Sequence, residues 1–130
     1  MTDSLDVLLA FFTKIDARIN AACRAAGQTL VTVIYSAYPE SEPRDNLDEI
    51  AIEGMCLLVQ PRNEFYGSKA SRHYCSDLLT NPTWLDLAVV ANAMMAVTRD
   101  KHHCYLEGVR RETDVDCADA APIYTFIMGS

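Results

Sequence analysis

The chain has 130 residues, of which half are apolar and 22% are charged, and this composition matches a globular domain and argues against a disordered, fibrous or low-complexity protein. Its formal net charge of −7 argues against direct binding of nucleic acid or of an anionic membrane, because both attract positively charged surfaces. We therefore expect one domain over residues 1–130, with neither nucleic acid nor a membrane as a direct partner.

The first predicted element is an amphipathic helix over residues 5–26. Its apolar side chains recur at helical spacing, at Leu5, Leu8, Leu9, Phe12, Ile15, Ile19, Ala22, Cys23 and Ala26. Asp3 or Ser4 can accept hydrogen bonds from the free amides at the start of the helix, and Gly27 can adopt the left-handed conformation that ends it. The apolar stripe requires a second surface to pack against.

Three segments of different character follow this helix. Residues 29–38 are rich in β-branched and aromatic side chains and are closed by a proline, which predicts a strand. Residues 47–60 are compatible with a helix or a strand, and the capping-box pair Asn46 and Glu49 favours the helix. Residues 61–71 contain proline, glycine, asparagine and serine, which predicts a connector.

Residues 82–98 predict a second helix, with Asn81 as its cap and Pro82 as its first residue. Apolar side chains surround this helix almost completely, so we expect it to be buried on most sides, in the centre of the domain or in a dimer interface. The basic side chains of the segment 99–103 suit the negative end of the helix dipole.

Residues 104–112 and 123–128 predict two more strands, joined by an acidic loop over 113–122. Together with the strand at 29–38, they can form an antiparallel sheet. Helices that cover one face of such a sheet give a two-layer domain. We therefore predict an α+β fold in which a small, three-stranded antiparallel sheet packs against two or three helices.

The cysteines and the hydropathy of the chain favour a cytoplasmic protein. Five cysteines are an odd number, and their irregular spacing does not resemble a disulfide framework. The first residues are acidic, unlike a signal peptide, and the longest apolar stretch, residues 87–97, is too short to span a bilayer.

All three histidines lie next to a cysteine or two residues from one. Imidazole nitrogen and thiolate sulfur are ligands that zinc prefers, so His73, Cys75, His102 and Cys104 are candidate ligands of a tetrahedral site. The alternative is that His73 lies at the surface, that His102 and His103 cap helix carbonyls, and that the cysteines are inert. We favour this structural role and expect no cofactor.

Asp100, His102, His103 and Glu107 form a second candidate group, directly after the helix at 82–98. A turn followed by a strand brings these titratable side chains together. Carboxylates and imidazoles in such a group can bind a ligand, hold a metal ion or act as general acids and bases. These four are the predicted ligand-binding residues, and no catalytic residue is predicted.

The sequence contains no Walker loop, no glycine-rich dinucleotide turn, no Gly-x-Ser-x-Gly elbow and no His-Glu-x-x-His helix. We therefore expect a small, acidic, non-enzymatic interaction or accessory protein that forms a homodimer through the helix at 82–98 or a sheet edge. One alternative is a metal-binding protein or metal-dependent hydrolase with its site around His102 and His103. Another is an acidic inhibitor or nucleic-acid mimic of a basic partner, which would use carboxylates crowded between Glu40 and Glu53.

Overall fold

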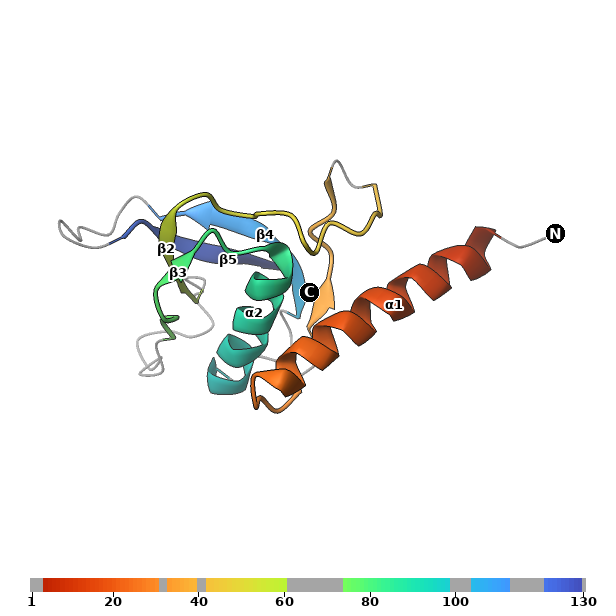
Figure 1. Ribbon diagram of the computed structural model, residues 1–130, viewed down its shortest axis with the longest axis horizontal. Helices are drawn as coiled ribbons and strands as arrows, with labels where there is room; N and C mark the ends of the chain where they lie inside the picture. The colour runs from red at the N-terminus through yellow and green to blue at the C-terminus, as the bar shows by residue number, and fades with distance from the viewer. Residues whose placement is uncertain are drawn as a thin grey trace.

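The computed structural model describes residues 4–30, 33–39, 42–60, 74–98, 104–112 and 121–129, which form two helices and five strands (Figure 1). In chain order these are α1 (Ser4–Ala25), β1 (Ile34–Tyr35), β2 (Met55–Val59), β3 (Leu79–Thr80), α2 (Trp84–Thr98), β4 (Tyr105–Arg111) and β5 (Ile123–Gly129). Neither of these two helices is long and apolar enough to cross a membrane.

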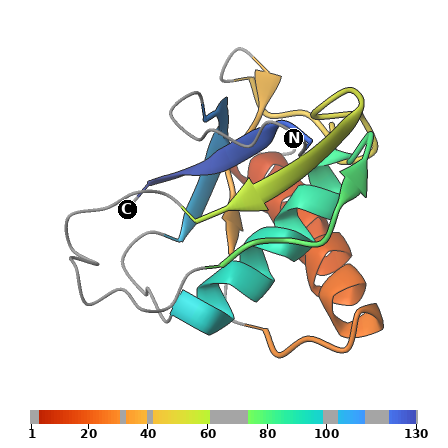
Figure 2. The ribbon, with the colours of Figure 1, turned by 90° about the vertical axis from the view of Figure 1, so that its left-hand side faces the viewer.

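The five strands form one mixed sheet in the order β1-β4-β5-β2-β3. Antiparallel pairing joins β4 to β5 and β2 to β3, whereas β1 is parallel to β4 and β2 is parallel to β5. The sheet curls over α2, and α1 packs against α2 and β1 (Figures 1 and 2). The prediction of a three-stranded antiparallel sheet is therefore wrong, although helices and strands combine in an α+β fold.

The middle of the chain accounts for most of this error. The helix predicted over 47–60 is wrong, because β2 lies there and enters the sheet between β5 and β3. Gly54 precedes β2 with a φ of 86°, a left-handed conformation that would interrupt a helix. In the described part of the strand predicted over 29–38, only the two residues of β1 are in the sheet, at its edge.

The ends of the chain agree with the sequence patterns. Gly27 has a φ of 74°, and the amides of Gly27 and Gln28 donate hydrogen bonds to the carbonyls of Arg24 and Cys23. This is a Schellman motif, and it ends α1 where the sequence predicts. The two predicted carboxyl-terminal strands are the antiparallel pair β4 and β5. The predicted connector over 61–71 lies outside the described residues.

α2 begins two residues later than predicted, because its cap is Thr83. The amide of Asp86 donates to the Thr83 hydroxyl at 3.2 Å, and the amide of Thr83 donates to the Asp86 carboxylate at 3.0 Å, which is a capping box. Asn81 instead has a φ of 48° and accepts a hydrogen bond from the amide of Gly54 at 2.6 Å. This bond joins the turn before β2 to the turn before α2.

The hydrophobic core lies between the helices and one face of the sheet. Its buried members include Ile15, Ile19 and Cys23 of α1, Leu87, Ala88, Ala91, Met94 and Met95 of α2, and Cys56, Leu58, Leu106 and Phe126 of the strands. The buried residues of α2 all lie on one side of that helix. Most of the remaining residues of α2 are half-buried, and only Asp86, Ala96 and Val97 are exposed. The domain therefore covers most sides of α2, as the sequence predicts, and leaves one side only partly covered.

Candidate functional site

The side of α2 that faces away from the core is apolar and carries one charge. This surface, which we call the outer face of α2, consists of Asp86, Val89, Val90, Ala93, Ala96 and Val97. Asp86, Ala96 and Val97 are exposed, and Val97 is 43% exposed. Val89, Val90 and Ala93 are half-buried, and the two valines also pack against the edge of the core. A helix at a protein surface ordinarily carries charged or polar residues on its solvent side. The outer face of α2 departs from this pattern.

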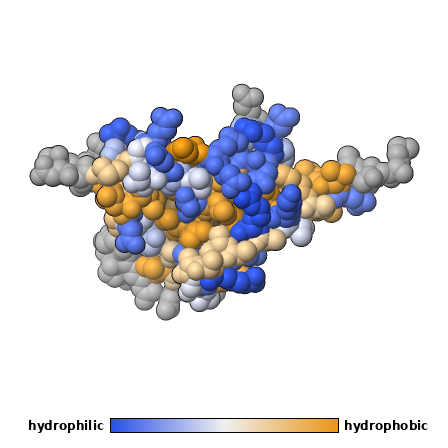
Figure 3. Space-filling model, viewed as in Figure 1, coloured by the Kyte–Doolittle hydropathy of each residue, from blue (hydrophilic) through white to orange (hydrophobic). Residues whose placement is uncertain are grey.

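A second apolar surface lies at the start of α1, which extends beyond the rest of the domain (Figure 1). Val7, Leu8 and Leu9 are exposed there, and Figure 3 shows hydrophobic side chains at this end of the molecule. Helical spacing places Leu8 and Leu9 on the same side of α1 as Phe12 and Asp16. This side of α1 therefore runs from the exposed leucines towards β1.

The face of the sheet that points away from the helices is also apolar. Side chains alternate along β2, so that Met55 and Leu57 point away from the core that contains Cys56. Leu57 pairs with Ile123 of β5, and Ile127 of the same strand is 43% exposed. The domain thus presents apolar side chains on two opposite sides.

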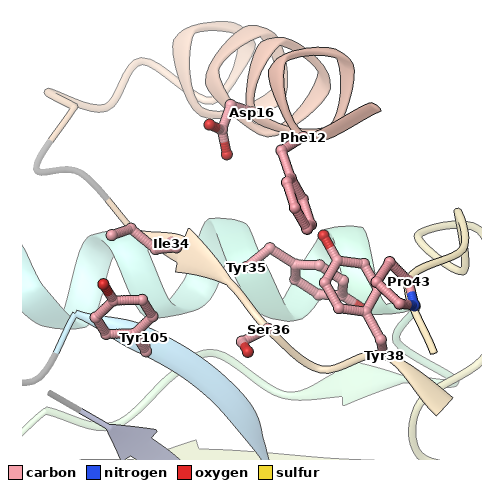
Figure 4. Close-up of a pocket in the computed structure, with 8 residues that line it drawn as sticks. All are labelled: Phe12, Asp16, Ile34, Tyr35, Ser36, Tyr38, Pro43 and Tyr105. Carbon is pink, nitrogen blue, oxygen red and sulfur yellow. The ribbon is translucent and has the colours of Figure 1, made fainter. Parts of the chain in front are cut away.

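A cavity of about 500 Å³ lies between α1 and β1 (Figure 4). The residues that line it come from α1, from β1 and the segment after it, and from β4: Phe12, Asp16, Ile34, Tyr35, Ser36, Tyr38, Pro43 and Tyr105. Four of these side chains are aromatic, and one, Asp16, is charged. In Figure 4, Phe12 points from α1 towards Tyr35 and Tyr38, and Asp16 lies above Ile34.

Tyr38 lies at the centre of the aromatic group. Its ring centroid is 6.0 Å from that of Phe12 and 5.1 Å from that of Tyr35, to which it is perpendicular. The Tyr38 hydroxyl is buried and has no hydrogen-bond partner among the described residues. Burial raises the pKa of Tyr38 to about 12, and the negative charges of Asp16 and Asp45 act in the same direction. The Tyr38 phenol is therefore neutral at physiological pH.

Hydrogen bonds fix the wall of the cavity formed by the segment after β1. The Tyr35 hydroxyl donates to Oδ1 of Asn46 at 2.8 Å, and Nδ2 of Asn46 donates to the carbonyl of Ala37 at 2.9 Å. Arg18 of α1 binds Asp45 through both carboxylate oxygens. These contacts attach the segment both to β1 and to α1, so the cavity has a defined shape.

The predicted ligand-binding group is described only in part. Asp100, His102 and His103 lie outside the described residues, and so does His73. Glu107 is exposed in β4, at the register shift between Leu106 and Gly108, and it does not line the cavity. A ligand site around these residues remains a prediction.

The two candidate zinc-binding cysteines lie at different places in the sheet. Cys75 is exposed and pairs with Val59 of β2, whereas Cys104 is half-buried and precedes β4. The strands β5 and β2 lie between them. Among the described residues, no three His, Cys, Asp or Glu side chains are grouped so as to hold a metal ion. With the histidines outside the described ranges, the zinc site also remains a prediction.

Several carboxylates of the acidic region between Glu40 and Glu53 have basic partners within the chain. Arg18 lies 2.8 Å from a carboxylate oxygen of Asp45 and 2.7 Å from one of Asp48, and Arg44 lies 3.0 Å from one of Glu49. These ion pairs partly neutralise the region that would act in an inhibitor or mimic of nucleic acid.

Comparisons with protein-family models, with curated proteins and with solved structures find no match for this chain.

Sequence reasoning did not identify the cavity. Phe12 and Asp16 are four residues apart in a helix, which predicts that they share one side, but Phe12 was assigned to the general apolar stripe. Tyr35 and Tyr38 occur in a segment where strand propensity alone accounts for tyrosine. The one signal in the sequence was the interruption of the stripe by an acidic residue at position 16.

Proposed function

We propose that this protein is a non-enzymatic interaction or accessory protein, and that it acts as a homodimer formed through the outer face of α2. The observation that carries the proposal is the composition of that surface: five of its six residues are apolar, one is charged, and it lies opposite the buried side of the helix. Apolar helix surfaces of this kind are favourable when another surface covers them.

A second copy of the chain suits this surface better than an unrelated protein for reasons of charge. Each copy carries a net charge of −7, so two copies repel each other wherever their carboxylates approach. Over the outer face of α2, Asp86 at the start of the helix is the only carboxylate. A two-fold axis places the same residues of both copies opposite each other, which allows the uncharged part of one helix to meet its equivalent.

The size of the side chains on the outer face of α2 also favours helix-to-helix contact. Ala93 lies at its centre and lets two helix backbones approach closely, Ala96 lies at its margin near the end of the helix, and Val89, Val90 and Val97 supply apolar area on either side of Ala93. The sheet edges are less suitable as contacts, because β1 and β3 each have two residues. Very short edge strands offer few backbone groups for pairing between chains.

Two matched substitutions, each of which introduces a carboxylate, test this proposal. Val97→Glu places a carboxylate on the outer face of α2, whereas Ile127→Glu places one on the opposite side of the domain, at a side chain of the same 43% exposure. Molar mass by light scattering should show a weaker dimer for Val97→Glu, with a dissociation constant raised at least about tenfold, and an unchanged dimer for Ile127→Glu. If the dimer dissociated in the Ile127→Glu variant and persisted in the Val97→Glu variant, the interface would be the outer face of the sheet and not α2.

A further inference from the structure

The cavity between α1 and β1 has the chemistry of a cation-binding site. We propose that it binds the side chain of a lysine or arginine in an apolar segment of a partner protein. Its volume of about 500 Å³ lies in the range of ligand pockets and exceeds what a single water molecule fills. The proposal goes beyond dimer formation, because none of the residues that line the cavity belongs to α2.

The charge of the cavity is the first argument. Among the described residues that line it, Asp16 alone is charged, and no described basic side chain lies within ion-pair distance of its carboxylate. Arg18, two residues further along α1, is bound to Asp45 and Asp48. Asp16 remains exposed to solvent, and the part of its surface that is buried raises its pKa. Its carboxylate is therefore open to a cationic ligand.

The aromatic rings are the second argument. Ring faces attract ammonium and guanidinium groups that approach within about 6 Å of the ring centroid. Phe12, Tyr35 and Tyr38 form a continuous group at one end of the cavity, and Tyr105 lies at the other end (Figure 4). The Tyr38 hydroxyl oxygen is buried and has no described partner, so it can accept a hydrogen bond from the N–H of such a ligand once the neighbouring side chains move aside.

The surroundings of the cavity indicate a polypeptide and not a free amine. Phe12 and Asp16 lie on the same side of α1 as the exposed Leu8 and Leu9, so the cavity continues into an apolar surface. A free amine would leave these leucines in water. A segment with a basic side chain between apolar ones would fill the cavity and cover the leucines together, and the acidic chain would attract it.

The first test adds small probe molecules to the intact protein. Changes in the backbone amide chemical shifts, measured by NMR, report where each probe binds. N-acetyl-lysine methylamide and N-acetyl-arginine methylamide should shift the amides around residues 12–16, 34–38 and 105, and N-acetyl-norleucine methylamide, which lacks the charge, should not. Asp16→Asn should weaken binding of the charged probes about two- to fivefold. Asp6→Asn removes a carboxylate from an exposed position of the same helix outside the cavity and should have no effect.

The second test separates a peptide from a free cation. A lysine flanked by leucines, as an acetylated and amidated tripeptide, should bind more tightly than the same tripeptide with glycines. Each tripeptide should bind the Val97→Glu variant as tightly as it binds the wild type. Equal affinity of the two tripeptides would overturn the peptide assignment. Shifts spread over the whole acidic surface, unchanged binding to Asp16→Asn, or equal binding of the norleucine probe to the wild type would overturn the site itself.

Discussion

The hydroxyl of Tyr35 donates a hydrogen bond to Oδ1 of Asn46 at 2.8 Å, and both residues are at most 3% exposed. This contact joins β1 to a turn eleven residues later in the chain. It shows why Asn46 does not cap a helix: its side chain is used by β1 and by the carbonyl of Ala37. The segment between these residues contains Tyr38 and Pro43, which form one end of the cavity.

Loss of the Asn46 side chain should therefore destabilise the protein. Asn46→Ala removes one of two partners of the Ala37 carbonyl and one of two partners of the Tyr35 hydroxyl, and we expect the free energy of unfolding to fall by about 1–3 kcal/mol in urea denaturation. Ser36→Ala, an exposed change in the same segment, should alter it by less than about 0.5 kcal/mol. Equal effects of the two substitutions would show that the Asn46 bonds contribute nothing particular to stability.

Arg18 should contribute more to stability than Arg44, although both form ion pairs. The Arg18 side chain is 29% exposed and bonds to two carboxylates, whereas Arg44 is 57% exposed and pairs with one. We expect Arg18→Ala to cost about 1 kcal/mol and Arg44→Ala less than about 0.5 kcal/mol, because exposed pairs are screened by water. Urea denaturation of both variants at low and high salt measures this difference. A larger loss for Arg44→Ala would contradict it.

Stability should fall as the pH rises through the range in which tyrosines ionise. Burial raises the pKa of Tyr38 from 10.0 to about 12, so the unfolded chain loses this proton before the folded chain does. The neutral phenol thus contributes its full stabilisation below the unfolded pKa, and the contribution is lost as the pH rises towards about 12.

Tyr38→Phe isolates the Tyr38 part of this effect. The free energy of unfolding of this variant, followed by urea denaturation at increasing alkaline pH, should decrease less steeply than that of the wild type. A parallel decrease in both proteins would mean that Tyr38 ionises in the folded state as readily as in the unfolded one. At neutral pH the variant should be at least as stable as the wild type, because the buried hydroxyl has no described partner.

The sequence predictions were correct where a structural element depends on residues close together in the sequence, and wrong where it depends on distant ones. The end of α1 at Gly27 and the pairing of β4 with β5 depend on neighbouring residues, and both were predicted correctly. β2 was missed because its place in the sheet depends on parallel pairing of Leu57 with Ile123, far along the chain. The local pattern at Asn46 and Glu49 is that of a helix cap, but the Asn46 side chain forms tertiary hydrogen bonds with Tyr35 and with the carbonyl of Ala37 instead.

The candidate site was less accessible to sequence reasoning than the fold. The cavity joins Phe12 and Asp16 to Tyr105, residues about ninety positions apart, and only the parallel pairing of β1 with β4 brings them together. The outer face of α2 was partly predicted: an almost uniformly apolar helix indicated burial, and an interface was one of the two explanations offered. Periodicity cannot say which side of such a helix the domain itself covers.

The molar mass of the wild-type protein in solution tests the central claim most directly. Light scattering at micromolar protein concentration should give twice the chain mass of 14.5 kDa, because the outer face of α2 is covered by a second copy. A mass of 14.5 kDa over the same concentration range would contradict the homodimer and leave that surface exposed to another partner.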